Sequence, residues 1–192
     1  MMIEKDWLFS SDEYTCDLRT VGVLVKNNRV LVQRDKNGSE YALPDGHIKI
    51  GETLEAGLVR EYKEVTRVDI KVKRLLWSEE YFWEWNRKLT HNIAFYYLIE
   101  ECDGCKIPDN GEFVSHKDNC NAVIGWMDIE ELKSIIVYPE FLKREIKSCL
   151  IRKWSLSLLK MIEISKPGLS MKKKRYMISL NPIQYLEEVL SF

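Results

Sequence analysis

Residues 46–68 read GHIKIGETLEAGLVREYKEVTRV, and this stretch carries the clearest structural signal in the chain. Its apolar side chains recur at steps of three and four residues: Leu54, Leu58, Tyr62 and Val65. This spacing predicts a helix from Thr53 to Thr66 with one apolar stripe along its length. Thr53 is a suitable N-cap residue, and Glu55 falls in the first turn, where negative charge stabilises a helix.

Two acidic side chains of this helix, Glu61 and Glu64, are three residues apart and are expected on one face. Like charges at this spacing repel, so a cation between them would stabilise the pair. Magnesium prefers such oxygen ligands, and a carbonyl of the preceding loop Pro44-Asp45-Gly46 is a further candidate ligand. The simpler interpretation of the spacing alone is two exposed helix glutamates.

The wider spacing resembles the Nudix box, which reads G, five residues, E, seven residues, R-E, an apolar residue, any residue, E-E, any residue, G, an apolar residue. The matching positions are Gly46, Glu52, Arg60, Glu61, Tyr62, Glu64 and Val68. The flanks are similar too, with Ala42-Leu43-Pro44 before the box and Trp126 ahead of an acidic stretch. The resemblance extends from Leu18 to Leu150. It implies an α/β (α+β) fold, a Nudix-type α/β/α sandwich with a mixed central sheet.

Three positions depart from the family pattern. Val65 stands where the family has the second glutamate of the E-E pair, so the chain lacks one carboxylate that commonly binds metal. Arg67 stands in place of the final glycine, at a helix end that often takes the left-handed conformation, which costs a non-glycine residue on the order of 1 kcal/mol. Asp45 replaces a frequent loop glycine and is a candidate to supply a compensating carboxylate; the alternative is an ordinary turn aspartate.

The resemblance implies hydrolysis of a nucleoside diphosphate linked to another group, a pyrophosphohydrolase reaction that depends on Mg²⁺ or Mn²⁺. The implied catalytic residues are Glu61, Arg60 and Glu52, with Glu52 and Arg60 paired to brace the loop against the helix. The implied metal ligands are Glu61 and Glu64. Further candidate ligands are the carbonyl of Gly46, the Asp45 carboxylate and, from the later loop, Asp118 or Glu112. Val65 and Arg67 motivate the alternative, a catalytically weak nucleotide- or sugar-nucleotide-binding sensor or interaction module.

Strands are expected around the box, because β-branched and aromatic residues cluster between turn signals. Leu18 to Val25 and Val30 to Arg34 are predicted to form a hairpin around Asn27-Asn28. Further strands are expected at Asp69 to Trp77, Asn92 to Ile99 and Ala122 to Met127. A helix is expected near Ile129 to Ser134, and another from Pro139, since proline is tolerated in a first helical turn. We therefore expect a catalytic domain over 1–151 and a partly helical C-terminal appendage over 152–192.

An aromatic run lies between two of these strands: Tyr81, Phe82, Trp83 and Trp85. Tyr81, Trp83 and Trp85 are candidates to stack on the base of a nucleotide-type substrate. The alternative is that the aromatic side chains pack on the sheet or form the face of a homodimer. Side chains alternate along a strand, so the four rings are not expected to point one way.

Composition restricts the class of protein. Apolar residues make up 45% and charged residues 31% of the 192-residue chain, typical of a globular protein, and the net charge of −1 gives no indication of nucleic-acid or membrane binding. No apolar run reaches the ~18 residues of a membrane span, and the first residues lack the pattern of a secretory signal.

The five cysteines form no recognisable disulfide framework, so a cytoplasmic location is expected. Cys102 and Cys105 form a lone C-x-x-C. A metal or redox role for this pair is the alternative to a hairpin turn around Asp103-Gly104.

Overall fold

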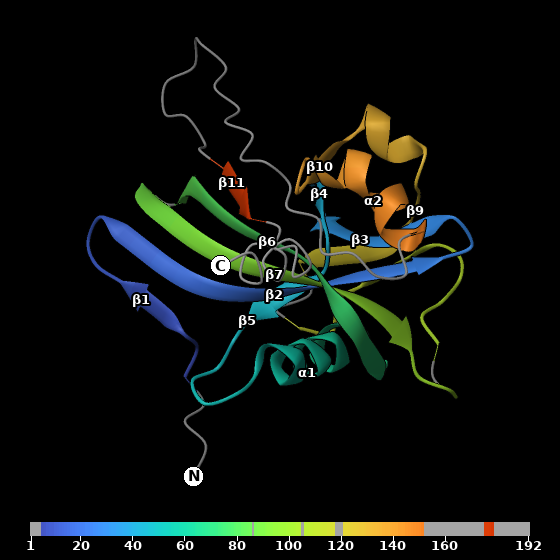
Figure 1. The fold of residues 1–192 in the computed structure, drawn as a ribbon, viewed down its shortest axis with the longest axis horizontal. Coiled ribbons are helices and arrows are strands. Elements are labelled where there is room, and N and C mark those ends of the chain that lie inside the picture. Colours follow the sequence, from blue (N-terminus) through green and yellow to red (C-terminus); the bar gives the residue numbers. More distant parts are fainter. Residues whose placement is uncertain (1–4, 86, 105, 118–120, 152–174, 179–192) are drawn as a thin grey trace, which may run out of the picture.

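A curled mixed sheet forms the centre of the fold in this computed structural model, which describes residues 5–85, 87–104, 106–117, 121–151 and 175–178. The elements follow in this order: β1 (Leu8–Ser10), β2 (Tyr14–Lys26), β3 (Arg29–Asp35), β4 (Glu40–Ala42), β5 (Asp45–His47), α1 (Leu54–Thr66), β6 (Ile70–Trp85), β7 (Lys88–Glu101), β8 (Glu112–Val114), β9 (Ala122–Asp128), the 3₁₀ helix η2 (Glu131–Ser134), β10 (Ile136–Tyr138), α2 (Leu142–Ile151) and β11 (Arg175–Ile178). Figure 1 shows α1 on one side of the sheet and α2 on the other.

Strand β2 is the central strand, because it pairs in parallel with β7 and antiparallel with β1, β3 and β5. β6 and β7 form a long antiparallel ribbon beside it. On the other side, β3 pairs with β4 and β9, and β4 pairs in parallel with β10. The predicted mixed sheet is therefore confirmed.

The predicted hairpin between β2 and β3 is also confirmed. Val25 pairs with Val30 and Lys26 with Arg29, so Asn27 and Asn28 alone form the turn. Both have positive φ, 51° and 60°, as a type I′ turn requires.

Helix α1 forms where its apolar spacing predicts it. Thr53 caps its first turn by accepting a hydrogen bond from the Ala56 N–H over 3.1 Å. Leu58, Tyr62 and Val65 are buried, as the predicted stripe requires. The helix ends at Arg67, whose φ of 62° is the left-handed conformation expected there.

The alternation of β2 separates two hydrophobic clusters, one on each face of the sheet. Val21 and Val23 belong to a cluster that includes Leu142 and Ile146 of α2. Leu24 belongs to the other cluster, together with the buried residues of α1. The predicted α/β/α sandwich is confirmed, because each helix covers one face.

Four local predictions need correction. The aromatic run does not lie between strands but inside β6, which continues to Trp85 because its partner β7 is equally long. The second helix begins at Leu142 rather than Pro139, because β10 runs to Tyr138 and the chain then turns. The helix expected near Ile129 is a short 3₁₀ turn from Glu131 to Ser134.

The fourth correction concerns the turn at Asp103-Gly104, which closes no hairpin. β7 ends at Glu101, and the next strand, β8, pairs with β9. Cys105 lies outside the described residues.

Most of the expected C-terminal appendage also lies outside the described residues. Its described part, β11, pairs antiparallel with β6, Arg175 being opposite Tyr81 and Ile178 opposite Ser78. Within the described residues, no helix is long and apolar enough to cross a membrane.

Candidate active site

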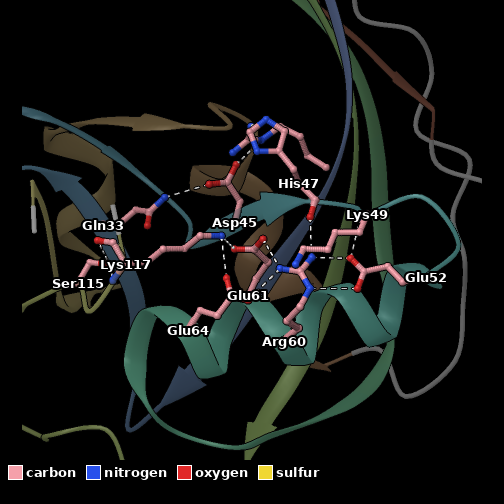
Figure 2. Close-up of polar contacts among 11 residues, drawn as sticks. Gln33, Asp45, His47, Lys49, Glu52, Arg60, Glu61, Glu64, Ser115 and Lys117 are labelled. Atoms are coloured by element: carbon pink, nitrogen blue, oxygen red, sulfur yellow. Dashed lines mark hydrogen bonds and ion pairs between the residues drawn. The ribbon is translucent and has the colours of Figure 1, made fainter. Parts of the chain in front are cut away.

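Two groups of charged side chains lie along the polar side of α1 (Figure 2). The first joins Glu52 and Arg60 near the start of the helix. The second gathers Glu61 and Glu64 around a lysine from a distant loop. Together they bring the residues predicted from the box into one site.

Glu52 and Arg60 form a two-point ion pair. Arg60 Nε donates to Glu52 Oε2 over 3.1 Å, and Arg60 Nη2 donates to Glu52 Oε1 over 2.5 Å. The same Nη2 reaches the His47 carbonyl over 3.0 Å, and Glu52 also accepts the Lys49 N–H over 2.7 Å. The pair therefore fixes the loop after β5 onto α1.

The charges of this pair stabilise each other. Burial raises the pKa of the Glu52 carboxyl, but hydrogen bonds from Arg60 and the Lys49 N–H outweigh burial and lower it overall. The hydrogen bond to Glu52 raises the pKa of Arg60. Both side chains are thus held in their charged forms across the neutral range.

Glu61 is almost fully buried, with 3% of its surface exposed, and it lies directly against Gly46 of β5. A Cβ atom at position 46 would be only 2.0 Å from Glu61 Cδ. Gly46 is therefore needed for a close approach of the strand backbone to the helix carboxylate.

Lys117 supplies the positive charge between the two helix glutamates. Its Nζ lies 2.6 Å from Glu61 Oε2 and 2.9 Å from Glu64 Oε2. Arg60 Nη1 contacts the other oxygen of each glutamate, 2.7 Å from Glu61 Oε1 and 3.3 Å from Glu64 Oε1. Figure 2 shows the Lys117 side chain reaching across to these carboxylates. Two cationic side chains thus engage all four carboxylate oxygens.

These contacts shift the ionisation of the group. Burial lowers the pKa of Lys117, but its hydrogen bonds to Glu61 and Glu64 outweigh burial and raise it overall. Burial raises the pKa of Glu64, but Lys117 and then Arg60 lower it overall. The ammonium and the carboxylate are therefore both charged at neutral pH.

The loop that carries Lys117 is anchored through its backbone. The Ser115 N–H donates to the Ala122 carbonyl over 2.8 Å, and Ser115 Oγ accepts the Lys117 N–H over 3.1 Å. The His116 N–H donates to the Val65 carbonyl over 3.0 Å, at the last turn of α1. Lys117 was not predicted from the sequence, where the only signal for it was the expectation of some cation between the two glutamates.

The departures from the family pattern have different structural settings. Val65 is buried in the cluster beneath α1, so its side chain serves as core. Asp45 engages both of its oxygens elsewhere, one with Arg19 Nε over 2.7 Å and one with Gln33 Nε2 over 3.0 Å. A role for Asp45 in metal binding stays a prediction.

The donor set of Glu61 and Glu64 is the type that a hard divalent cation prefers, because one oxygen of each carboxylate lies within 2.9 Å of a single point, the Lys117 ammonium. Across the part of the chain that the structure describes, no group of three or more His, Cys, Asp or Glu side chains is arranged to hold a metal ion.

Two candidate ligands were predicted from the later loop, Asp118 and Glu112. Asp118 lies outside the described residues. Glu112 pairs with Arg34 over 2.6 Å.

The proposed substrate aromatics lie on β6. Tyr81 lines a cavity of about 60 Å³, which has room for only a few water molecules. Asp45, Glu79, Tyr96 and Tyr138 also line it. Trp83 Nε1 donates to Asn92 Oδ1 over 2.7 Å, and Phe82 stacks on His91 with ring centroids 4.3 Å apart. The backbone of Trp85 pairs with Lys88 at the end of the ribbon. Substrate binding by Tyr81, Trp83 and Trp85 stays a prediction.

Comparison with known protein families assigns the chain to a family. A family model described as NUDIX domain matches residues 17–147, which is more than half of the chain and includes every strand and helix around the site. The chain belongs to the NUDIX domain family.

Individual relatives of this NUDIX domain match over shorter stretches. An ADP-ribose pyrophosphatase of Methanocaldococcus jannaschii is 43% identical over 58 residues, which cover 29% of this chain and 34% of that protein. Nudix hydrolase 5 of Arabidopsis thaliana is 31% identical over 115 residues, which cover 57% of this chain and 35% of that protein. The NUDIX domain thus matches only about a third of the length of these relatives.

A solved structure is also similar, the MutT NUDIX hydrolase from Burkholderia pseudomallei. It is 18% identical, with a TM-score of 0.47, over 67% of this chain and 95% of that chain.

Proposed function

We propose that this NUDIX domain is a divalent-metal-dependent hydrolase of a nucleoside diphosphate linked to another group, with activity weakened by Val65 and Arg67. The observation that carries the proposal is that Glu61 and Glu64 each place an oxygen beside the Lys117 ammonium, at 2.6 and 2.9 Å. The name of the archaeal relative, ADP-ribose pyrophosphatase, supports a substrate with a linked diphosphate.

Hydrolysis of such a substrate adds one water molecule across the P–O–P link. The water oxygen bonds to one phosphorus, the bond from that phosphorus to the bridging oxygen breaks, and the other phosphate leaves. Glu61 and Glu64 would hold Mg²⁺ or Mn²⁺, which when bound neutralises phosphate charge and lowers the pKa of water. The Gly46 carbonyl and Asp118 are further proposed ligands.

The remaining residues of the box have positioning roles in this proposal. The Glu52–Arg60 pair holds the loop after β5, and with it Gly46, against the helix. Glu61 is the proposed ligand or general base, since its carboxylate is buried against Gly46 of β5. Fixed positions of this kind contribute to catalysis by orienting the reacting groups.

The experiment is a turnover assay on ADP-ribose, sugar nucleotides, dinucleoside polyphosphates and nucleoside triphosphates, with Mg²⁺ and with Mn²⁺. Glu61→Gln should reduce turnover about 100-fold or more, the usual effect of losing a positioned acid or base. Glu55→Gln is the matched control, because Glu55 is an exposed glutamate in the first turn of the same helix. Equal loss in both variants, or none in Glu61→Gln, would contradict the proposal.

A second candidate is a nucleotide-binding module with little or no turnover. It is favoured by the burial of Val65, which leaves two helix carboxylates already neutralised by Lys117 and Arg60. Val65→Glu separates the two candidates, because it restores the family's third carboxylate. Turnover by Val65→Glu alone, with nucleotide-dependent stabilisation of the parent protein, would support the binding module.

A further inference from the structure

The Lys117 ammonium lies beside Glu61 and Glu64, the two carboxylates that are proposed to bind the metal ion. We infer that Lys117 is a built-in competitor for the divalent cation, so that metal binds the two carboxylates only when the Lys117 ammonium withdraws. The inference rests on the proposed function, because it concerns the same carboxylates.

The charges at the site depend strongly on Lys117. Glu52, Glu61 and Glu64 contribute −3, while Arg60 and Lys117 contribute +2, so the five connected side chains sum to −1. Without the Lys117 ammonium the sum would be −2. The field that attracts a divalent cation is therefore weakened while Lys117 stays in place.

Of the two cationic side chains, Lys117 is the one that a metal ion can displace. Arg60 is held by Glu52 at two points and by the His47 carbonyl, so it is fixed independently of the two carboxylates. The Lys117 ammonium has hydrogen bonds to Glu61 and Glu64, and 30% of the side chain is exposed. Its long stem has four rotatable bonds, whereas its backbone is anchored through Ser115. The ammonium can thus leave while the loop stays in place.

The decisive experiment is titration calorimetry of the full chain with Mn²⁺ in the absence of substrate. Lys117→Met should bind Mn²⁺ at least tenfold more tightly than the parent protein, equivalent to about 1.4 kcal/mol. Lys117→Arg keeps the charge and should stay close to the parent affinity. Lys63→Met is the matched control, because Lys63 is on α1 with Glu61 and Glu64 but pairs with the exposed Asp69 over 2.6 Å.

The outcomes distinguish this inference from the proposed function. Equal Mn²⁺ affinity in the parent protein and Lys117→Met overturns the inference and leaves the hydrolase proposal standing. Absence of Mn²⁺ binding in both proteins overturns the inference and the metal requirement together. A comparable gain in Lys63→Met would assign the effect to net charge and also overturn the inference.

A second measurement uses the unmodified protein and so does not depend on the folding of a variant. Lysines are acetylated with a limiting amount of an amine-reactive reagent, with and without Mg²⁺. Mass spectrometry measures the extent of modification at each lysine. Mg²⁺ should increase modification of Lys117 severalfold and leave Lys63 unchanged. Unchanged modification of Lys117 at saturating Mg²⁺ would overturn the inference.

Discussion

The two halves of the 46–68 segment neutralise their carboxylates in different ways. In the first half, Glu52 finds its partner eight residues later, in Arg60 of the same segment. In the second half, Glu61 and Glu64 share Arg60 but also depend on Lys117, which follows β8. The first arrangement is local and is implied by the motif, whereas the second exists only because the fold brings a distant loop to the helix.

The largest expected effect on stability is at Gly46, which is in the first half and contacts Glu61 of the second half. Gly46→Ala should destabilise the protein by about 3 kcal/mol, because the added methyl group collides with the buried Glu61 carboxylate at 2.0 Å. Urea unfolding measures the change. Gly38→Ala is the control, since its added Cβ would meet Asp35 Cβ at a milder 3.2 Å.

This prediction has an internal check. In the double variant Gly46→Ala, Glu61→Ala the colliding carboxylate is gone. The Gly46→Ala substitution should therefore cost less than about 1 kcal/mol when it is measured against Glu61→Ala alone. A cost that persists in the double variant would place the clash elsewhere.

An intermediate effect tests the local pair. Glu52→Gln should reduce the free energy of unfolding at pH 7 by about 1–2 kcal/mol, because charge-assisted hydrogen bonds to Arg60 are weakened. Lys117→Met should cost less, since 30% of Lys117 is exposed and Arg60 still neutralises the carboxylates.

The pH dependence of this effect follows from the lowered pKa of Glu52. A carboxyl with a lowered folded-state pKa contributes stability above its unfolded value of about 4.3, and this contribution is lost as pH falls through the folded value. The difference between the parent protein and Glu52→Gln should therefore shrink below pH 4. Melting temperatures recorded from pH 7 to pH 3 measure it, and a constant difference would show that the charge of Glu52 is not the cause.

The smallest expected effect is at the end of the helix. Arg67→Gly should stabilise the protein by about 0.5–1 kcal/mol, because Arg67 has a φ of 62° and glycine adopts this conformation without strain. Denaturant unfolding measures the gain, and Arg67→Ala should not show it. A gain in the alanine variant would point to the arginine side chain instead of the backbone.

Local elements could be predicted from sequence where one face of an element is buried. The stripe of α1, the Asn27-Asn28 turn and the Thr53 cap depend on neighbours within four residues, and all three form as expected. The extent of β6 and the start of α2 depend on strand partners, β7 and β4, that are distant in the chain. Both boundaries were accordingly predicted wrongly.

By itself, the sequence determined the family and the position of α1, because helix periodicity and motif spacing act within a few turns. The pairing of Glu52 with Arg60 was implied by the resemblance to the Nudix box. Only the tertiary structure decided that Val65 is core, that Gly46 lies against Glu61 and that Lys117 supplies the cation for Glu61 and Glu64. The reason is physical. A buried carboxylate requires neutralisation, but which positive side chain provides it depends on which loop the packing of α1 and the sheet brings within hydrogen-bonding distance.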